Sequence, residues 1–427
     1  MLAVLRQRDY GLLWFGGFVS TLGDFVLFAG LPYEIYRRTG STIAMAGMSL
    51  AFLLPNILLG SVAGVYVDRW DRRRLMIAVN LLQAVSLLPL LLVDQLGLWV
   101  VYAVLVAESS ISQLFGPARV ALIPSLLKGG KEELLTANAL IGVSQHLARL
   151  IGPAVGGIIV ATGGLGAVAV LDSASFVVSA GMITLIGARP PAPHPADSLE
   201  HAALSAWRRL VNEWRSGLRT VWHHPVLRAL LAFAFITAIG EGLTVTLFVV
   251  WTTVALHSDA TGYGWVLSTQ AIGGLAGALV IARLGSRLQP IRLLIGSALA
   301  FGAIDLVLFT YPAIYPYIGP ALVMLVIVGV PGAGLGAAVT TLQQSQTQDS
   351  HRGRVVSAIS AVAGFGALIG TLTAGILGEF LPVILLLVVQ GSGYLIAGTT
   401  VALMVGRRRI QPDSQEVAGV GSAGEQS

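Results

Sequence analysis

The sequence predicts an all-α membrane protein, and composition and hydropathy both point to that class. Hydrophobic residues make up 55% of the 427-residue chain and only 11% of the residues are charged, about half the charged fraction of a soluble domain. Apolar windows of about 18 residues or more recur along the whole length, as in membrane-spanning helices, whereas a membrane β-barrel would show short alternating segments. The chain contains no cysteine, which excludes disulfides, thiolate catalysis and cysteine-bound metal.

Twelve apolar segments are long enough to cross a bilayer as helices, since each crossing needs about 20 residues. Nearly all Lys and Arg residues fall on one side of the membrane if the N-terminus is cytoplasmic. Because basic residues accumulate in cytoplasmic segments, both termini are predicted to be cytoplasmic. The expected spans are 11–36, 43–67, 75–94, 98–118, 134–160, 166–187, 226–254, 261–284, 292–311, 317–342, 355–378 and 383–405.

The two groups of six spans resemble each other in sequence. "STLGD" at 20–24 matches "TAIGE" at 237–241, and "LIGPAVGGII" at 150–159 matches "LIGTLTAGIL" at 368–377. The two offsets differ by one residue, which indicates a duplication with parallel topology; chance similarity of glycine-rich helices is the alternative. The domains expected are a six-helix bundle at 1–187, a cytoplasmic linker at 188–225, a second six-helix bundle at 226–409 and a disordered tail at 410–427.

The linker begins with the proline-rich stretch "ARPPAPHP", which is expected to be stiff and extended. An amphipathic helix follows, with most of its arginines off the apolar face. This pattern is typical of a helix at the cytoplasmic membrane surface, and a partner-binding helix is the alternative. The apolar face consists of Trp207, Leu210, Trp214, Leu218 and Val221.

A knot of charge, "GVYVDRWDRRR" at 64–74, interrupts the apolar sequence between the second and third spans. The arginines are explained if they keep this loop on the cytoplasmic side of the membrane. That role does not explain Asp68, which lies at the end of a span. A carboxylate at that depth needs a partner, either a guanidinium or the N-terminal end of a facing helix.

The knot resembles the signature loop of the major facilitator superfamily. Tyr66 and Asp71 depart from the usual pattern, which has Leu and Gly at those positions. The matching residues are Gly64, Asp68, Arg69, Arg72 and Arg73. The resemblance implies a fold of two six-helix bundles, in which this loop meets the start of span 11 and one of its arginines pairs with Asp349. The knot would then be a cytoplasmic latch that forms in one conformation and breaks in the other.

Span 5 contains "RLIGPAVGGIIV", which looks like the motif of the superfamily's exporters. Small residues at this spacing let two helices approach closely, and ordinary helix packing is the alternative explanation. The motif residues are Gly152, Pro153, Gly156 and Gly157. "FGPARVALIPSLL" and "LQQSQTQDSHRGRVVS" are similar to a narrower group that contains enterobactin-type siderophore exporters, macrolide efflux proteins and Tap-like multidrug pumps.

Four ionisable residues lie well inside the predicted spans: Asp24, Glu108, Arg149 and Glu241. Such groups are rare in membranes and mark ion or substrate pathways. In the functional interpretation, carboxylates on cavity-lining spans exchange a proton as access alternates, and a cationic substrate competes for them. In the structural interpretation, Glu108 and Arg149 form a buried pair, and Asp24 and Glu241 are hydrogen-bonded between helices.

Other polar residues in the spans are expected to line the cavity, to pack between helices or to form ion pairs. A stripe on span 7 that includes Thr237, Glu241 and Thr252 is expected to line the cavity. Asp172 and Asp305 are expected toward the outer ends of their spans, in packing or interfacial roles. Glu34 is expected to pair with Arg37 and Arg38.

The sequence does not resemble an enzyme, because it has no phosphate-binding glycine loop and no metal-ligand spacing. The leading interpretation is a secondary-active efflux transporter that exchanges an amphipathic, drug-like or siderophore-like molecule for protons by alternating access. An uptake system or a lysophospholipid flippase of the same fold is the alternative, and a non-transporting scaffold or sensor is a remote one. We expect a monomer in the bacterial inner membrane, without cofactor, metal or nucleic-acid partner, that interacts with substrate, protons and the lipid bilayer.

Overall fold

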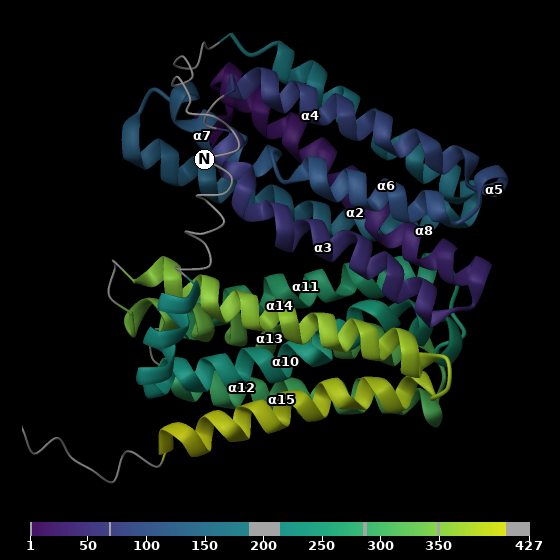
Figure 1. Ribbon diagram of the computed structural model, residues 1–427, viewed down its shortest axis with the longest axis vertical. Coiled ribbons are helices and arrows are strands. Elements are labelled where there is room, and N and C mark those ends of the chain that lie inside the picture. The colour runs from purple at the N-terminus through teal and green to yellow at the C-terminus, as the bar shows by residue number, and fades with distance from the viewer. Residues whose placement is uncertain (1, 68–69, 188–213, 285–287, 348–350, 407–427) are drawn as a thin grey trace, which may run out of the picture.

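The structure is a computed structural model that describes residues 2–67, 70–187, 214–284, 288–347 and 351–406. Its regular structure there consists of helices, without strands among these residues. Two stacked groups of long helices form the molecule, and both groups run roughly parallel to one direction (Figure 1). The proline-rich stretch and the tail at 410–427 lie outside the described residues.

The first half of the chain contributes α1 to α8. Their bounds are α1 (Leu2–Leu5), α2 (Arg8–Thr39), α3 (Thr42–Val67), α4 (Arg72–Leu87), η1 (Leu88–Leu92), α5 (Val93–Leu96), α6 (Trp99–Ser112), α7 (Phe115–Leu126) and α8 (Gly130–Thr184). The second half contributes α10 (Pro225–Val250), η2 (Trp251–Ala255), α11 (Ala260–Leu284), α12 (Pro290–Thr310), η4 (Tyr311–Ala313), α13 (Ile318–Ser345), α14 (Arg352–Gly378) and α15 (Val383–Gly406).

Eleven helices in the described residues are long and apolar enough to cross a membrane. The longest, α8, has 55 residues and is broken at Gly164, where φ is 66°. At this left-handed φ glycine meets no steric penalty. Ala137, Gly152 and Val160 of α8 lie beside Tyr10, Phe25 and Gly30 of α2, whereas Val168, Ser175 and Met182 lie beside Gly30, Gly23 and Gly16. The chain therefore turns back at Gly164, and α8 has two antiparallel arms.

The structure confirms the all-helical membrane architecture. Its long helices coincide with the predicted spans to within a few residues, α8 accounting for two of them, except that the fourth span continues through α7 to Leu126. The count of twelve and the cytoplasmic position of the termini stay predictions. Following that predicted orientation, we call the end at which α2 begins the cytoplasmic end and the opposite end the outer end. The predicted pairing at the outer end of α2 is confirmed, because Glu34 accepts from Arg37 and Arg38 at 2.7 Å.

Three hydrophobic clusters hold the helices together, and their positions differ between the two ends. One cluster at the outer end joins both halves and includes Val26, Leu31, Val160, Leu247, Trp251 and Leu325. Two separate clusters lie at the cytoplasmic end, one within each half: Tyr10, Leu13, Met76 and Leu122 belong to the first, and Leu227, Leu230, Leu294 and Val355 to the second. Among the described residues, the two halves therefore share a core at the outer end and have separate cores at the cytoplasmic end.

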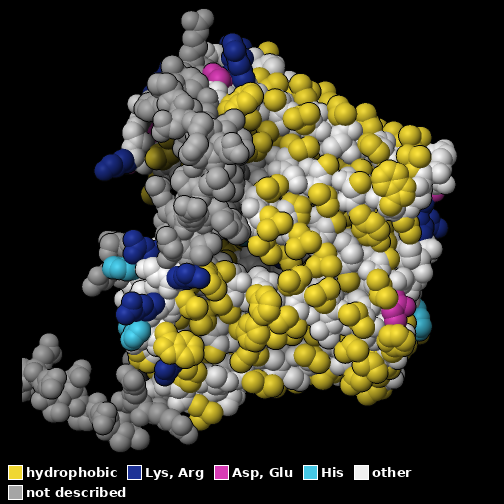
Figure 2. Space-filling view, in the orientation of Figure 1, with side chains coloured by type: hydrophobic (Ala, Val, Ile, Leu, Met, Phe, Trp, Pro, Cys, Tyr) yellow, Lys and Arg dark blue, Asp and Glu magenta, His cyan; other side chains and the backbone are white. Residues whose placement is uncertain are grey.

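Direct contacts between the halves follow the same pattern. Thr42 at the outer start of α3 donates to the carbonyl of Gly375 in α14 at 2.9 Å. The Ala154 N–H of α8 donates to Ser268 of α11 at 3.0 Å. The helices of the two halves converge toward the right of Figure 1, and the surface is hollowed between them toward the left (Figure 2). The structure is therefore closed at the outer end and open toward the cytoplasmic end.

Candidate functional site

The predicted mid-span residues lie in one layer of the molecule. Asp24 lies between Leu13 of the first cytoplasmic cluster and Val26 of the shared outer cluster. Glu241 occupies the corresponding layer of the second half, between Leu230 and Leu243. Both carboxylates are exposed. They lie where the shared core ends and the two halves separate, at the inner limit of the cytoplasmic opening.

Three carboxylates form a group in the first half. Asp24 interacts electrostatically with Asp172 and with Glu108. Glu108 is buried and accepts a hydrogen bond from Gln83 Nε2 at 2.6 Å. Asp172 is fully buried, and its Oδ1 accepts from Ser175 Oγ at 3.1 Å, while Oδ2 has no partner among the described residues. We call Asp24, Asp172 and Glu108 the first carboxylate group.

A second carboxylate group, Glu241 and Asp305, lies in the other half. Tyr394 Oη donates to Glu241 Oε1 at 2.5 Å, and Gln390 Nε2 donates to Asp305 Oδ2 at 2.8 Å. Asp305 is buried and interacts electrostatically with Glu241. As in the first half, one exposed carboxylate is backed by a buried one.

The exposed carboxylates of the two groups, and the glycines before them, are related by the internal repeat. A Cβ on Gly23 would collide with the Asp172 carboxylate, and a Cβ on Gly240 would lie 2.9 Å from Cα of Gln390. Gly23 and Gly240 precede Asp24 and Glu241 directly. In both halves a glycine therefore lets a polar residue of the sixth span approach the helix that carries the exposed carboxylate.

Arg149 faces the second half from the first arm of α8. It is exposed, and in the described part of the chain it makes no hydrogen bond or ion pair. It lies one turn before Pro153, whose carbonyl packs against Gly264 of α11. Its charge interacts with that of Glu241. The expected alternative of a buried pair with Glu108 is wrong, because Glu108 binds Gln83 instead.

The other polar residues of the spans are largely buried. Asp172 and Asp305 are hydrogen-bonded to Ser175 and Gln390, as expected for packing roles, and each lies beside a carboxylate of the predicted site. In the polar stripe on α10 Glu241 is exposed, but Thr237 and Thr252 do not line an opening, since both are buried and donate to the carbonyls of Phe233 and Phe248 in their own helix. The length of a span does not give the neighbours of a residue, so the sequence alone does not place the two buried carboxylates beside Asp24 and Glu241.

The predicted helix-packing residues of α8 face two neighbours. Gly152 and Gly156 pack against α2, where a Cβ on Gly156 would lie 2.6 Å from the Val26 carbonyl oxygen. Pro153 and Gly157 pack against α11 of the other half, and a Cβ on Gly157 would collide with the backbone of Ala260. This stretch therefore joins the first half internally and also joins it to the second half.

The charge knot is described in part. Gly64 lies in α3, whereas Asp68, Arg69 and Asp349 lie outside the described residues. Asp71 caps α4 by accepting from the Arg74 N–H at 2.8 Å. Arg72 Nη1 donates to the Ala121 carbonyl at 3.5 Å, and Arg73 Nε donates to the Ile183 carbonyl at 3.1 Å. Both arginines are bound within their own half in this cytoplasm-open structure.

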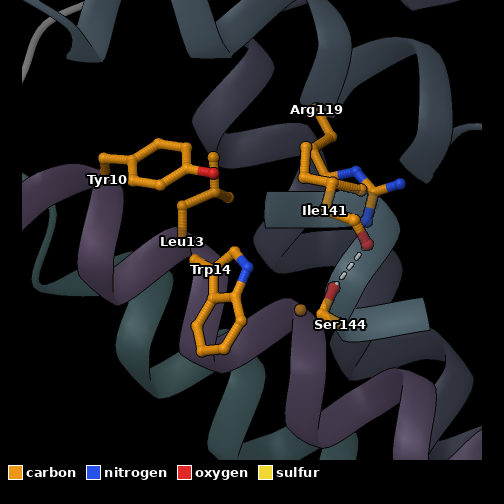
Figure 3. Close-up of a pocket in the computed structure, with 7 residues that line it drawn as sticks. Tyr10, Leu13, Trp14, Arg119, Ile141 and Ser144 are labelled. Carbon is orange, nitrogen blue, oxygen red and sulfur yellow. Dashed lines mark hydrogen bonds between the residues drawn. The ribbon is translucent and has the colours of Figure 1, made fainter. Parts of the chain in front are cut away.

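A small cavity lies at the cytoplasmic end of the first half, between α2, α7 and α8 (Figure 3). Tyr10, Trp14, Arg119 and Ser144 help to line it, and its volume is about 10 Å³. A space of this size holds about one water molecule. The substrate site is therefore to be sought in the layer of the carboxylates rather than here.

In the part of the chain that the structure describes, no three His, Cys, Asp or Glu residues are placed to hold a metal ion. Ionisable side chains within membrane spans mark ion or substrate pathways in many transporters. The exposed carboxylates, the arginine without a partner among the described residues and the core that the two halves share at the outer end make this layer the candidate site.

Comparison with known proteins agrees with this assignment. The model of a family described as transmembrane secretion effectors matches residues 1–417. The multidrug efflux pump Tap of Mycolicibacterium fortuitum is 27% identical over 385 residues, covering 86% of this chain and 88% of the pump. The enterobactin exporter EntS of Citrobacter koseri is 25% identical, covering 92% of this chain and 90% of the exporter.

Among solved structures, a bacterial homologue of the iron transporter ferroportin in an inward-facing state matches with a TM-score of 0.72. The two proteins are 18% identical, and the match covers 93% of this chain and 98% of the homologue. At this identity the likeness concerns the fold alone.

Proposed function

The chain belongs to the transmembrane secretion effector family of the major facilitator superfamily, and we propose that it exports an amphipathic small molecule in exchange for protons. It is a multi-pass transporter of the bacterial inner membrane and not an enzyme. The proposal concerns the coupling ion, the substrate class and the residues that bind them. We expect it to function as a monomer, because each half-site is complete within one chain.

One observation carries the proposal: Asp24 and Glu241 are exposed at the layer where the shared outer core ends. A carboxylate deep in a membrane protein is costly, and binding of a cation, a proton or water offsets this cost. We infer from this position that both side chains are reached from the cytoplasmic opening. Rocking the two halves about the carboxylate layer would close that opening and expose the same residues to the outside.

Proton coupling is supported by the buried partners of these carboxylates. Asp24, Asp172 and Glu108 repel one another when all three are ionised, and a bound proton or cationic substrate relieves this repulsion. Binding of one cation therefore disfavours binding of the other at the same group. This competition couples the outward movement of substrate to the inward movement of protons.

The substrate class follows from the charges that face the opening. Exposed carboxylates in an apolar layer suit a cationic or neutral amphiphile. The relative Tap is named as a multidrug efflux pump, which makes a drug-like compound the first probe. Arg149 favours a second candidate, an anionic compound, because its guanidinium is exposed and has no partner among the described residues. The exporter EntS is named for enterobactin, which makes a siderophore the appropriate anionic probe.

The charge knot supports a cytoplasmic latch. We propose that Asp68, Arg69, Arg72 and Arg73 engage the start of α14 and Asp349 when the cytoplasmic opening closes. In the open structure Arg72 and Arg73 bind carbonyls of their own half, which keeps these guanidinium groups satisfied until the halves approach. Replacing Asp68 by Asn would then leave insertion intact and abolish transport.

The proposal is tested in proteoliposomes that contain a pH-sensitive dye. Addition of ethidium as a cationic probe, or of enterobactin as an anionic one, is expected to drive proton flux through the native protein. Asp24→Asn and Glu241→Gln should reduce this flux to the background of empty liposomes. Asp94→Asn is the matched control, because Asp94 is an exposed outer carboxylate that binds Arg38 within one half. Transport that persists in both site variants, or that ignores collapse of the proton gradient, contradicts the proposal.

A further inference from the structure

A recess lies at the cytoplasmic end of the second half, away from the carboxylate layer. Its volume is about 410 Å³, and its lining residues come from a single stretch of chain that includes the helical residues 214–223. The lining side chains are Ser216, Arg219, Thr220, His223 and His224. None of these residues takes part in the transport pathway described above.

Packing against α14 fixes this helix in place. A Cβ on Gly217 would collide with the carbonyl of Arg354, so the helix and α14 are in close contact. Val221 is fully buried in the cytoplasmic cluster of the second half. Ser216 accepts a hydrogen bond from Arg354 Nη1 at 3.4 Å. With one face of the helix held in this way, Arg219 and His223 remain exposed.

The chemistry of the recess suits a phosphate group. Its lining offers the Arg219 guanidinium, the Ser216 hydroxyl and two imidazoles, whereas Thr220 Oγ1 donates to the Ser216 carbonyl at 3.1 Å. No carboxylate is among these five residues. His223 Nδ1 donates to the Arg219 carbonyl at 2.7 Å, so its Nε2 donates to a phosphate oxygen only when the ring is an imidazolium. His224 Nδ1 is buried and has no partner among the described residues. Phosphate oxygens accept several such donors at once, and guanidinium groups fit them in a bidentate manner.

The position of the recess identifies the source of the phosphate. The helix α10, which is long and apolar enough to cross the membrane, begins at Pro225, directly after His224, so the recess lies next to the cytoplasmic start of a membrane span. Trp222 beside it is 62% exposed, and exposed tryptophan is enriched at the level of lipid headgroups. Figure 2 shows Lys, Arg and His side chains gathered at this left edge of the lower half.

We propose that the recess lined by Ser216, Arg219, Thr220, His223 and His224 binds the phosphate of an anionic lipid of the cytoplasmic leaflet. The lipid would fix the helix at 214–223 to the membrane surface and to the start of α14. This inference does not depend on the substrate or on the coupling ion.

The test uses the purified full-length protein in detergent and measures lipid binding by native mass spectrometry. Dioctanoyl phosphatidylglycerol is the anionic probe, dioctanoyl phosphatidylcholine the zwitterionic one, and inorganic phosphate tests a soluble source. Arg219→Gln is expected to weaken phosphatidylglycerol binding roughly fivefold, since one arginine near an anionic membrane surface is worth about 1 kcal/mol. Arg215→Gln is the matched control, because Arg215 is exposed on the same helix and does not line the recess.

The lipid site is supported if the protein prefers phosphatidylglycerol to phosphatidylcholine, and if this preference is lost in Arg219→Gln and retained in Arg215→Gln. Binding of inorganic phosphate with the same dependence on Arg219 and no preference among lipids would retain the phosphate site and overturn its lipid source. Equal binding of both lipids without an effect of Arg219, or equal effects of the two arginine variants, overturns the proposal. Circular dichroism of each variant excludes unfolding as the cause.

Discussion

Glu379 Oε1 accepts a hydrogen bond from Ser41 Oγ at 2.6 Å, although the two residues belong to opposite halves of the transporter. The same oxygen accepts from the Ile43 N–H at 3.1 Å. The carboxylate thus caps the N-terminal end of α3 from the other half, where a negative charge is favourable. Because the outer ends must meet for this contact to form, it stabilises only the state that is open to the cytoplasm.

The first prediction concerns this outer contact. Glu379→Gln removes the charge, and we expect a larger share of molecules with the cytoplasmic end closed. Spin labels on Leu135→Cys and Leu284→Cys measure this, because both positions are exposed at the cytoplasmic end and the chain has no other cysteine. The distance between the labels should shorten in Glu379→Gln and stay unchanged in Asp94→Asn. Equal distance distributions in the two variants would contradict the role of Glu379.

The same contact gives a pH dependence with a defined sign. Hydrogen bonds from Ser41 and from the Ile43 N–H hold the pKa of Glu379 below the ordinary glutamate value of 4.5. A lowered pKa means that the stabilisation is present above the ordinary value and is lost as the pH falls through the lower one. The label distance should therefore be constant from about pH 8 to 5 as far as Glu379 is concerned. If the label distance changes in that pH range by the same amount in the native protein and in Glu379→Gln, then groups other than Glu379 cause the change.

The second prediction concerns the glycine contact between α8 and α11. Gly157→Ala should disfavour the outer-closed state, because the added Cβ collides with the backbone of Ala260 in the other half. Gly274→Ala is the control, since a Cβ at this position of α11 meets nothing within 4 Å. Both variants should insert normally, and only Gly157→Ala should shorten the distance between the labels. A shift of the same size in Gly274→Ala would show that helix propensity and not the contact is responsible.

The sequence predicts the helices well, because long apolar segments separated by charge leave little choice of span. It also locates Asp24 and Glu241, since two acidic residues at matching places of a repeat stand out in an apolar chain. Arg149 stands out for the same reason, because it is a charged residue within an apolar span. Local signals of this kind need no knowledge of how the helices pack.

The neighbours of Asp172 and Asp305 depend on packing, which the sequence does not give. Distance along a span leaves the facing helix of a residue undetermined. A signal is present, because Gln390 occupies the place of Asp172 in the second repeat, and each of the two lies beside a glycine that precedes an acidic residue. A comparison of all polar positions between the two repeats would place Asp172 beside Asp24.

The third prediction concerns the hydrogen bond between Tyr394 and Glu241. Tyr394→Phe removes a donor to a carboxylate, and such bonds contribute about 1.5–3 kcal/mol. We expect the pH dependence of transport in proteoliposomes to change, with the protein still folded. Tyr311→Phe is the control, because it removes a hydroxyl that bonds the Tyr317 carbonyl at the outer end. An unchanged pH profile in Tyr394→Phe would show that this bond does not tune the site.

The fourth prediction concerns the close approach of α2 and the second arm of α8. Gly23→Ala places a Cβ against the Asp172 carboxylate and Ser175, and overpacking of this kind destabilises a protein by about 1–3 kcal/mol. Gly181→Ala should be neutral or stabilising, because its Cβ meets nothing within 4 Å and alanine favours a helix over glycine by about 1 kcal/mol. Thermal unfolding in detergent should therefore separate the two variants.

A double variant decides whether the collision with Asp172 is the cause. Asp172→Ala shortens the side chain that the new methyl group meets, so it should restore part of the stability that Gly23→Ala loses. The coupling between two contacting sites is the departure of the double variant from the sum of the single effects. Purely additive effects would mean that Ser175 or the backbone of α2, and not the buried carboxylate, requires a glycine at position 23. Coupling would instead establish that the chain keeps a glycine before Asp24 so that a second carboxylate can lie beside it.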